Sequence, residues 1–425
     1  MMVSKKQSGF IKDVVVTFLG QIIVLVTNFL INKMIAIFVG VSAFGIFNIT
    51  KRSATVIGFI ILLELGISIP RYFAMNLKKD KLLAYEYYES GLYLIIIVSI
   101  IAIVISFFCS DMLTKMLFGS MKYKNLIMPM MVFSIGLCFN TFCFSAYRGA
   151  EYFYLYSGIQ ITTQVVNMLV IYILRHNGIA EIILGWGISN IILTIPLVMF
   201  FSKLCNIFIF IKIRKFKKRT FELLKYGIPR IPGDIVQFSY YLLPLVFVNA
   251  RFGQINSGLF SASTGILQAF LPFFSYIGII LLPRVSKAIV DGTLENVKKQ
   301  IKVLMIIYLF FSVLAVVVGF VFAKYIMIIL YSEKYTAHLI IARILLLTLI
   351  PRSQFLLLRN PIDAVTVKPF NTVNLVISMT VMIVIIVFSN SMYAIAWSFV
   401  ISDTLLFLFS YATWNKLIRE KENGK

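Results

Sequence analysis

The chain has 425 residues, of which 60% are hydrophobic and only 13% are charged. Its mean hydropathy is +0.93, and so few polar residues cannot cover the surface of a soluble globule of this size. Composition therefore excludes a soluble protein and indicates an integral membrane protein. The formal net charge is +23, because 40 Lys and Arg residues stand against 17 Asp and Glu residues.

Apolar runs along the chain predict twelve membrane-spanning helices. Runs of roughly 17 to 25 residues are long enough to cross the hydrocarbon layer. The first run follows a cluster of lysines and lacks a small-residue cleavage site, so we expect a retained helix rather than a signal peptide. In chain order the predicted spans are 12–39, 44–70, 89–109, 124–147, 154–174, 180–202, 231–249, 259–283, 302–322, 337–358, 369–388 and 392–414.

Basic residues are concentrated on one side of this predicted membrane. If both termini are cytoplasmic, most of the 40 Lys and Arg residues fall in cytoplasmic segments and few lie in external loops. This positive-inside pattern is typical of a multi-pass protein and favours an even number of crossings. The basic charge is therefore explained by topology, and we predict no nucleic-acid partner.

The second half of the sequence repeats features of the first. Six crossings per half mean that both halves enter the membrane from the same side, so the repeat is parallel. We predict an all-α polytopic membrane protein of two six-helix bundles, an architecture typical of transporters. Gly40, Gly45, Phe47, Pro70 and Arg71 recur as Gly253, Gly258, Phe260, Pro283 and Arg284, and Trp186 recurs as Trp397.

A basic segment separates the halves. We expect an N-terminal six-helix bundle over 1–211, a basic cytoplasmic linker over 212–230 and a C-terminal six-helix bundle over 231–425. The favoured interpretation of the linker is an orientation anchor against the anionic inner leaflet. A surface that recruits lipid head groups is the alternative.

The sequence argues against an enzyme. The longest external loops, 110–123 and 323–336, are too short to fold as domains. Outside the spans no paired carboxylates come together for acid and base catalysis. The four cysteines and two histidines lack the spacing of a metal or redox site, so we predict neither a metal nor a cofactor.

Polar side chains follow single faces of four predicted spans, two in each half. Polar groups within a membrane are costly unless they face a cavity or a partner. The simplest arrangement that removes them from lipid is a central, water-filled cavity. These stripes are Thr17, Gln21, Asn28 and Asn32 with Lys33 beside them; Asn48, Lys51, Arg52 and Thr55; Arg230, Asp234, Gln237 and Tyr241; and Ser261, Thr264, Gln268 and Ser275.

The wall of this cavity is predicted to be mainly cationic, and a cationic cavity suits an anionic substrate such as a phosphate or pyrophosphate. The predicted substrate-binding residues are Asn28, Asn32, Lys33, Lys51, Arg52, Arg230, Gln268, Arg343 and Arg352. The predicted ion-coupling residues are the acids Glu64, Asp234 and Asp403.

Each of these assignments has a structural alternative. Lys33, Lys51 and Arg230 are close enough to helix ends to extend to an interface instead. For Arg52 and Arg352, cavity lining is favoured over an internal salt bridge to one of the three acids. Arg343 and Arg352 fall on opposite faces of an ideal helix, so both can line the cavity only if a proline at position 351 bends it.

Several short motifs resemble those of a known transporter family. They are Phe44-Gly-Ile-Phe47, Glu64-Leu-Gly-Ile-Ser-Ile-Pro-Arg-Tyr-Phe73, Tyr147-Arg-Gly-Ala-Glu-Tyr152, Leu224-Lys-Tyr-Gly-Ile-Pro-Arg-Ile-Pro232, Ser257-Gly-Leu-Phe260 and Leu282-Pro-Arg-Val-Ser286. Over nearly the whole chain the sequence resembles the Wzx-type polysaccharide biosynthesis proteins of the MATE-like MOP exporter superfamily. It departs from them at Arg230, where relatives more often have an apolar residue.

The resemblance implies a flippase of the bacterial cytoplasmic membrane, with both termini in the cytoplasm. Its expected substrate is an undecaprenyl-pyrophosphate-linked oligosaccharide for O-antigen or exopolysaccharide synthesis. Membrane lipids and a glycan polymerase complex are the other implied partners. No Gly-rich, Lys-containing ATP loop occurs in the sequence, so we expect an ion gradient or consumption of the product to drive transport.

Two rival functions stay open from the sequence. An ion-coupled drug exporter of the same fold would depend on carboxylates rather than bases. A membrane-embedded glycan polymerase or acyltransferase is disfavoured by the short loops and the lack of paired catalytic groups.

Overall fold

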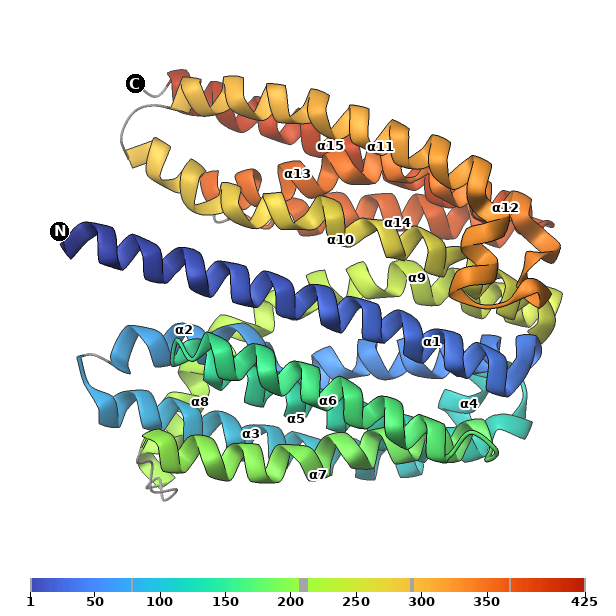
Figure 1. Cartoon of the computed structure of the whole chain (residues 1–425), viewed down its shortest axis with the longest axis horizontal. Helices are drawn as coiled ribbons and strands as arrows, with labels where there is room; N and C mark the ends of the chain where they lie inside the picture. The colour runs from blue at the N-terminus through green and yellow to red at the C-terminus, as the bar shows by residue number, and fades with distance from the viewer. Residues whose placement is uncertain (1, 78, 206–212, 291–293, 367, 424–425) are drawn as a thin grey trace. The chain divides into compact units, whose positions relative to one another are not determined.

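The computed structural model describes residues 2–77, 79–205, 213–290, 294–366 and 368–423 (Figure 1). These residues form helices and connecting turns, with no strand among them, so the predicted all-α fold class is confirmed. The chain divides into two compact units. Unit 1 comprises Met1–Gly40 and Phe47–Phe238, and unit 2 comprises Val41–Ile46 and Ser239–Lys425.

The helices follow the predicted spans closely. Up to the boundary they are α1 (Met2–Leu62), α2 (Leu65–Leu77), α3 (Lys81–Phe108), α4 (Ser110–Phe118), η1 (Met121–Leu126), α5 (Ile127–Gly149), α6 (Phe153–Ile173), α7 (Ile179–Cys205), α8 (Ile213–Gly227) and η2 (Ile228–Arg230). They continue with α9 (Ile231–Phe252), α10 (Gln254–Val290), α11 (Leu294–Leu330), η3 (Glu333–His338), α12 (Leu339–Leu347), α13 (Leu349–Val365), α14 (Phe370–Phe388) and α15 (Met392–Asn423).

Ten segments of the described chain are long and apolar enough to cross a membrane. The first of them, Val16–Leu77, has 62 residues. It includes the second predicted span and all of the first except residues 12–15, because α1 turns sharply at Gly40. The fifth predicted span corresponds to α6, which is helical but is not among the ten. The linker predicted over 212–230 is mostly α8, while residues 206–212 lie outside the described chain.

Backbone conformation repeats between the two halves. Gly40 has φ of 75° and Gly253 has φ of 83°, a left-handed region that glycine enters without steric cost. Each of the two glycines turns the chain between two consecutive helices. The sequence repeat therefore marks the same backbone turn twice.

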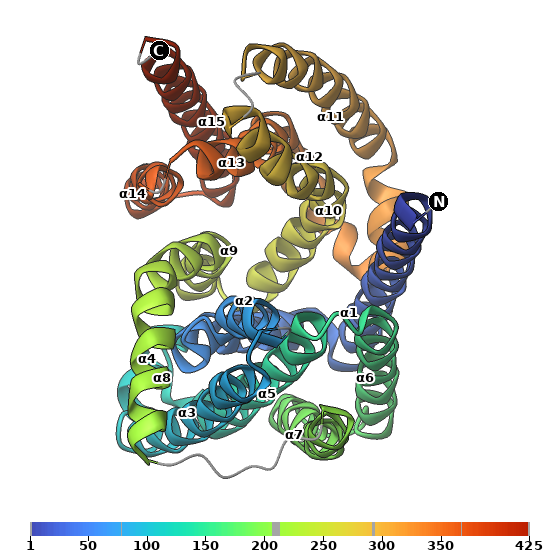
Figure 2. The ribbon, with the colours of Figure 1, turned by 90° about the vertical axis from the view of Figure 1, so that its left-hand side faces the viewer.

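Unit 1 is organised around α5. This helix contacts α2, α3, α6 and α7, as the end-on view of Figure 2 shows. Small residues allow the closest approach, because a Cβ atom on Gly136 would lie 2.6 Å from the carbonyl oxygen of Gly187 on α7. Ser134 and Ser145 of α5 donate to the carbonyls of Ala54 and Gly66, at 2.8 Å and 2.9 Å.

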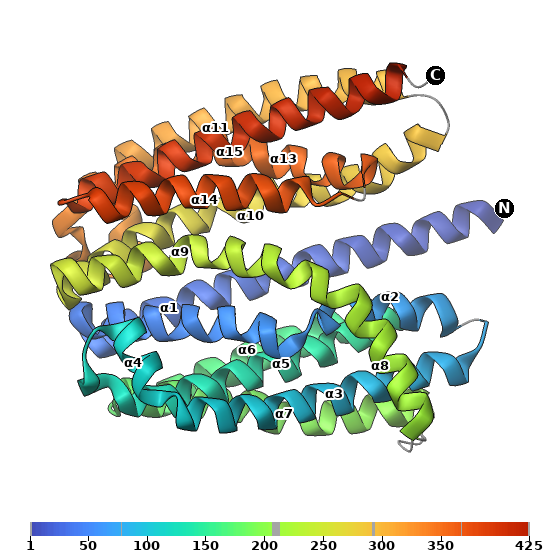
Figure 3. The same ribbon diagram turned by 180° about the vertical axis from the view of Figure 1, so that it is seen from behind.

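Unit 2 contains a second helical bundle. The helices α14 and α15 lie side by side (Figure 3), and α13 packs against α10, α11 and α15. An apolar cluster joins the ends of these helices around Leu358, Trp414 and Ile418. Segment Val41–Ile46 belongs to this unit: a Cβ atom on Gly258 would lie 1.9 Å from the carbonyl oxygen of Val41.

Candidate functional site

A break in a membrane helix positions one acidic residue of unit 1. Predicted span 44–70 is divided between α1 and α2, where Leu63 and Glu64 have φ of 49° and 60°. Such angles are strained for residues with a Cβ atom and often occur at functional sites. The Glu64 carbonyl accepts the amides of Ile67 and Ser68 at 3.1 Å and 3.0 Å, which starts α2. The break thus fixes the place from which the Glu64 side chain extends.

Glu64 and Asp234 line one pocket of unit 1, with a volume of about 280 Å³. Their carboxyl groups lie within hydrogen-bonding range of each other. A hydrogen bond between two carboxyl groups requires a proton on one of them, because a carboxylate can only accept. Glu64 is only 4% exposed, so the pair brings two acidic side chains together where at least one of them is buried.

Two arginines lie near this carboxyl pair. Arg148 lines the same pocket and donates from Nη2 to the carbonyl of Gly66 at 2.8 Å. Arg230 is close enough for its charge to act on Glu64, and it donates from Nη1 to the carbonyl of Tyr226 at 2.6 Å. Two of the three predicted ion-coupling acids are therefore together, with one predicted substrate-binding base beside them.

Polar side chains of two further helices complete the pocket wall. Gln160 and Tyr156 of α6 line the pocket, and Gln21 of α1 donates from Nε2 to Oε1 of Gln160 at 2.8 Å. Thr141 of α5 lies on the same wall. The carboxyl pair therefore shares its pocket with uncharged polar groups of unit 1.

Lys51 lies in a second polar site of unit 1. Its Nζ donates to Oδ1 of Asn32 at 3.3 Å and lies 5.1 Å from the ring centroid of Trp186. The turn at Gly40 makes this contact possible, because it folds the arm of α1 that carries Asn32 back along the arm that carries Lys51. Among the described residues Lys51 forms no salt bridge, so its partners are an amide and aromatic rings.

This site is confined to one of the two repeats. The position in unit 2 that corresponds to Lys51 is occupied by Thr264, which is fully buried. Trp186 is 3% exposed, whereas its repeat partner Trp397 is 45% exposed. The cation and its aromatic contact are therefore specific to unit 1.

Most of the other predicted substrate-binding residues are half-buried. Asn28 and Asn32 donate their amides to main-chain carbonyls of α1, four residues earlier in each case. Lys33 and Arg52 are half-buried on α1, and Gln268 is half-buried on α10 of unit 2. Asn32 is in direct contact with a predicted base, because its Oδ1 accepts from Lys51.

The contacts of Arg352 differ from the role that the sequence favoured for it. Cavity lining was favoured for this residue, but it forms an internal salt bridge of 2.9 Å to Asp403 in unit 2. The side chains are 4% and 1% exposed, and the guanidinium lies 5.1 Å from the ring centroid of Tyr240. The charge of Arg352 is thus balanced by Asp403. Asp403 is the third predicted ion-coupling acid, and this salt bridge is its partner.

Arg343 and Arg352 lie on separate helices. The division at Thr348 follows from Pro351, which has no amide hydrogen to donate to the carbonyl four residues earlier. Arg343 donates from Nε to the carbonyl of Phe320 at 3.2 Å, and its guanidinium stacks on the Phe320 ring at 4.9 Å. This contact belongs to the α11–α12 packing of unit 2, apart from the Arg352 pair.

Sequence reasoning missed Arg148 and the residues Tyr156 and Gln160. Arg148 lies in the last turn of α5, where a basic residue is usually interpreted as an anchor at the membrane surface. Its presence in the motif Tyr147–Tyr152 was the available signal.

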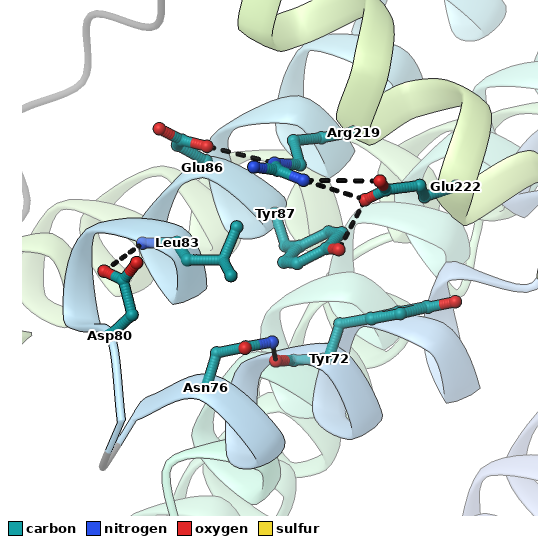
Figure 4. A network of polar contacts seen from close by, with 8 residues as sticks. All are labelled: Tyr72, Asn76, Asp80, Leu83, Glu86, Tyr87, Arg219 and Glu222. Atoms are coloured by element: carbon teal, nitrogen blue, oxygen red, sulfur yellow. Dashed lines mark hydrogen bonds and ion pairs between the residues drawn. The ribbon is translucent and has the colours of Figure 1, made fainter.

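The basic segment between the halves forms part of unit 1. Arg219 of α8 pairs with Glu86 of α3 at 3.0 Å and with Glu222 at 3.1 Å (Figure 4). Tyr87 of α3 donates to Glu222, and its ring lies under the Arg219 guanidinium. The α8 helix is therefore attached to α3 by a partly buried ionic and aromatic network.

No protein-family model matches the sequence, and no curated protein is similar to it in sequence. Solved structures do match. An inward-facing multidrug resistance MATE family transporter of the MOP superfamily superposes with a TM-score of 0.76 at 11% identity, covering 93% of this chain and 94% of that one. The chain has the MATE transporter fold.

Other MATE-fold structures cover a similar share of the chain. An outward-facing multidrug resistance MATE transporter gives a TM-score of 0.69 at 13% identity and covers 97% of both chains. A MOP superfamily transporter from Pyrococcus furiosus, for which a binding pocket of reverse polarity suggests a different function, gives 0.70 at 12% identity and covers 97% and 96%. These superpositions establish the fold, and at identities this low they establish nothing more. The prediction of a MATE-like fold is confirmed.

Proposed function

We propose that this protein is an alternating-access transporter that moves an anionic, lipid-linked oligosaccharide across the cytoplasmic membrane. The observation that carries this proposal is Lys51, an ammonium group within a membrane helix that no carboxylate balances among the described residues. A charge in that position is costly and marks a substrate or ion pathway by default. The expected substrate is an undecaprenyl-pyrophosphate-linked oligosaccharide.

The groups that hold Lys51 favour recognition of an anion. The side-chain amide oxygen of Asn32 and the ring face of Trp186 orient the Lys51 ammonium, but neither group carries a negative charge that would balance it. A pyrophosphate brought to this place would gain a charge-assisted hydrogen bond. In our proposal Asn28, Lys33, Arg52, Arg230, Gln268 and Arg343 are further candidate substrate contacts, whereas the Arg352–Asp403 pair is structural.

The carboxyl pair Glu64–Asp234 supplies the coupling step of the proposed mechanism. It lies at a backbone break, near enough to Arg230 for the charge of that residue to act on Glu64. A change in the proton occupancy of this pair changes the charge of unit 1 and can bias a conformational equilibrium. Transport would then draw on the proton gradient without ATP.

A proton-coupled exporter of organic cations is the second candidate function. The same carboxyl pair favours it, because a cationic substrate needs acidic groups, and multidrug resistance transporters share the fold. The two candidates differ in the group that the cargo needs. The flippase needs Lys51, and the cation exporter needs Glu64 and Asp234 for binding.

Reconstitution into vesicles tests the proposal directly. The purified protein is placed in liposomes that carry a fluorescent polyprenyl-pyrophosphate oligosaccharide, and its translocation is measured by accessibility to a membrane-impermeant quencher. We expect translocation by the unchanged protein and loss of it in Lys51→Gln, with Lys324→Gln as the matched control on an exposed lysine. Unimpaired translocation by Lys51→Gln, or proton-driven efflux of a cationic dye without any glycolipid movement, would overturn the flippase assignment.

A further inference from the structure

A groove of about 870 Å³ lies within unit 2, between α11, α13 and α15. Its α11 side consists of Lys298, Lys302, Met305 and Leu309, which recur at intervals of three and four residues and so form one continuous stripe. The α15 side is a second stripe at helical spacing, Thr404, Phe407, Tyr411 and Trp414. The groove therefore follows the length of these helices.

One end of the groove is strongly basic. Lys298, Lys299 and Lys302 border it together with a single acid, Glu295. Glu295 pairs with Lys299 at 3.2 Å, and the lining of this end has three lysines for this one acid. An anionic group at this end would be attracted by several ammonium groups at once.

The groove becomes apolar within two turns of the lysines. Leu309 lies about 10 Å beyond Lys302 along the α11 axis, from the helical rise of about 1.5 Å per residue. Phe407 of α15 lies on the wall of the groove near this part, whereas Trp414 packs with Val297 and Ile301 at the basic end. The adjacent surface of α11 is also apolar and exposed, with Ile306 at 63% and Phe310 at 64%, as expected for a helix that faces lipid.

Between the basic and apolar parts lies one polar group with unused hydrogen-bonding capacity. Gln354 of α13 lines the groove and donates from Nε2 to the carbonyl of Met305 at 3.0 Å. Its Oε1 is buried and has no hydrogen-bond partner among the described residues. Buried polar atoms in proteins are nearly always satisfied, so this oxygen indicates an occupant that donates a hydrogen bond.

We propose that this groove binds an anionic glycerophospholipid. The phosphate contacts Lys298 and Lys302, a head-group or glycerol hydroxyl donates to Gln354, and an acyl chain lies against Met305, Leu309 and Phe407. Along the groove the lysines come first, then the Gln354 oxygen, then the apolar surface. A glycerophospholipid has its phosphate, its hydroxyl groups and its acyl chains in positions that match this order. The site lies in unit 2, whereas Lys51 and the Glu64–Asp234 pair lie in unit 1, so it is independent of the proposed transport function.

Lipid retention by the purified protein tests this inference. The whole protein, delipidated in mild detergent, is titrated with phosphatidylglycerol or phosphatidylcholine, and bound lipid is counted by native mass spectrometry. We expect one phosphatidylglycerol to bind in preference to phosphatidylcholine. Replacing one basic residue near an anionic lipid changes affinity by about fivefold, so Lys298→Gln/Lys302→Gln should weaken binding at least that much.

Two further variants separate the groove from general surface charge. Leu309→Trp fills the apolar part and should also abolish retention of the lipid, whereas Lys324→Gln, at the other end of α11, should leave it unchanged. All variants are checked for the monodispersity and thermal unfolding of the parent protein. Equal binding of both lipids, an equal loss in Lys324→Gln, or a preference for a polyprenyl phosphate over phosphatidylglycerol would overturn the assignment.

Discussion

Gly227, the last residue of α8, packs against the backbone of Leu63, and a Cβ atom on it would lie 2.3 Å from the Leu63 carbonyl oxygen. That carbonyl belongs to the strained pair that divides α1 from α2 and positions Glu64. The α8 helix is itself fixed to α3 through Arg219. This contact between α8 and the helix break thus supports the geometry of the carboxyl pocket.

Gly227→Ala should destabilise the protein. The added methyl group meets main-chain atoms that cannot turn away, and overpacking of this kind costs about 1 to 3 kcal/mol. Thermal unfolding in detergent measures the effect. Gly158→Ala is the control, because nothing lies within 4 Å of a Cβ atom there; alanine in that exposed helical position should be neutral or slightly stabilising.

Removal of one partner of the Arg352–Asp403 pair should be strongly destabilising. Either Arg352→Ala or Asp403→Ala leaves an unpaired charge in a buried site, which costs about 3 to 5 kcal/mol. Arg352→Met/Asp403→Leu should recover much of this loss, because it removes both charges together. A double-mutant cycle on detergent-solubilised protein measures the coupling, and additive effects would show that the two groups do not interact.

Arg52→Ala should abolish glycan export while the protein remains in the membrane at normal levels. In the proposed mechanism Arg52 lies beside Lys51 and binds the same anionic cargo, and removal of such a contact typically costs about 2 to 5 kcal/mol. Export in cells that depend on this protein is compared with its abundance in isolated membranes. Full export by the variant would remove Arg52 from the substrate site.

Glu64→Gln and Asp234→Asn should uncouple transport from the proton gradient. Each amide keeps the size of the side chain but cannot exchange a proton. The unchanged protein should transport faster when a pH gradient is imposed across the vesicle membrane, and the variants should not respond. A variant that retains the full response would show that the coupling group lies elsewhere.

Sequence patterns were sufficient for the fold because the dominant signals are local. Apolar runs specify the spans, and the glycine repeat identifies the turns at Gly40 and Gly253, where the left-handed backbone conformation favours that residue. The separation of Arg343 from Arg352 follows from Pro351, the residue at which a bend was considered from the sequence. Each of these features depends on residues that are neighbours in the sequence.

The site was less predictable because its contacts are distant in the sequence. Neither Leu63 nor Glu64 is a glycine or a proline, and the break packs against Gly227, which is distant in the sequence. Composition showed that bases outnumber acids, but it did not identify which acid would reach Arg352. The position of Asp403, on a helix near the end of the chain, decided that Arg352 has a structural partner.

The pairing of Arg352 with Asp403 has an electrical consequence. A transmembrane voltage of 100 mV does about 2.3 kcal/mol of work on each elementary charge that crosses it. The two opposite charges of this pair are joined at 2.9 Å, so they move through the field as one neutral object and contribute almost nothing to voltage dependence. Any gating current measured for this protein should therefore survive neutralisation of both residues together.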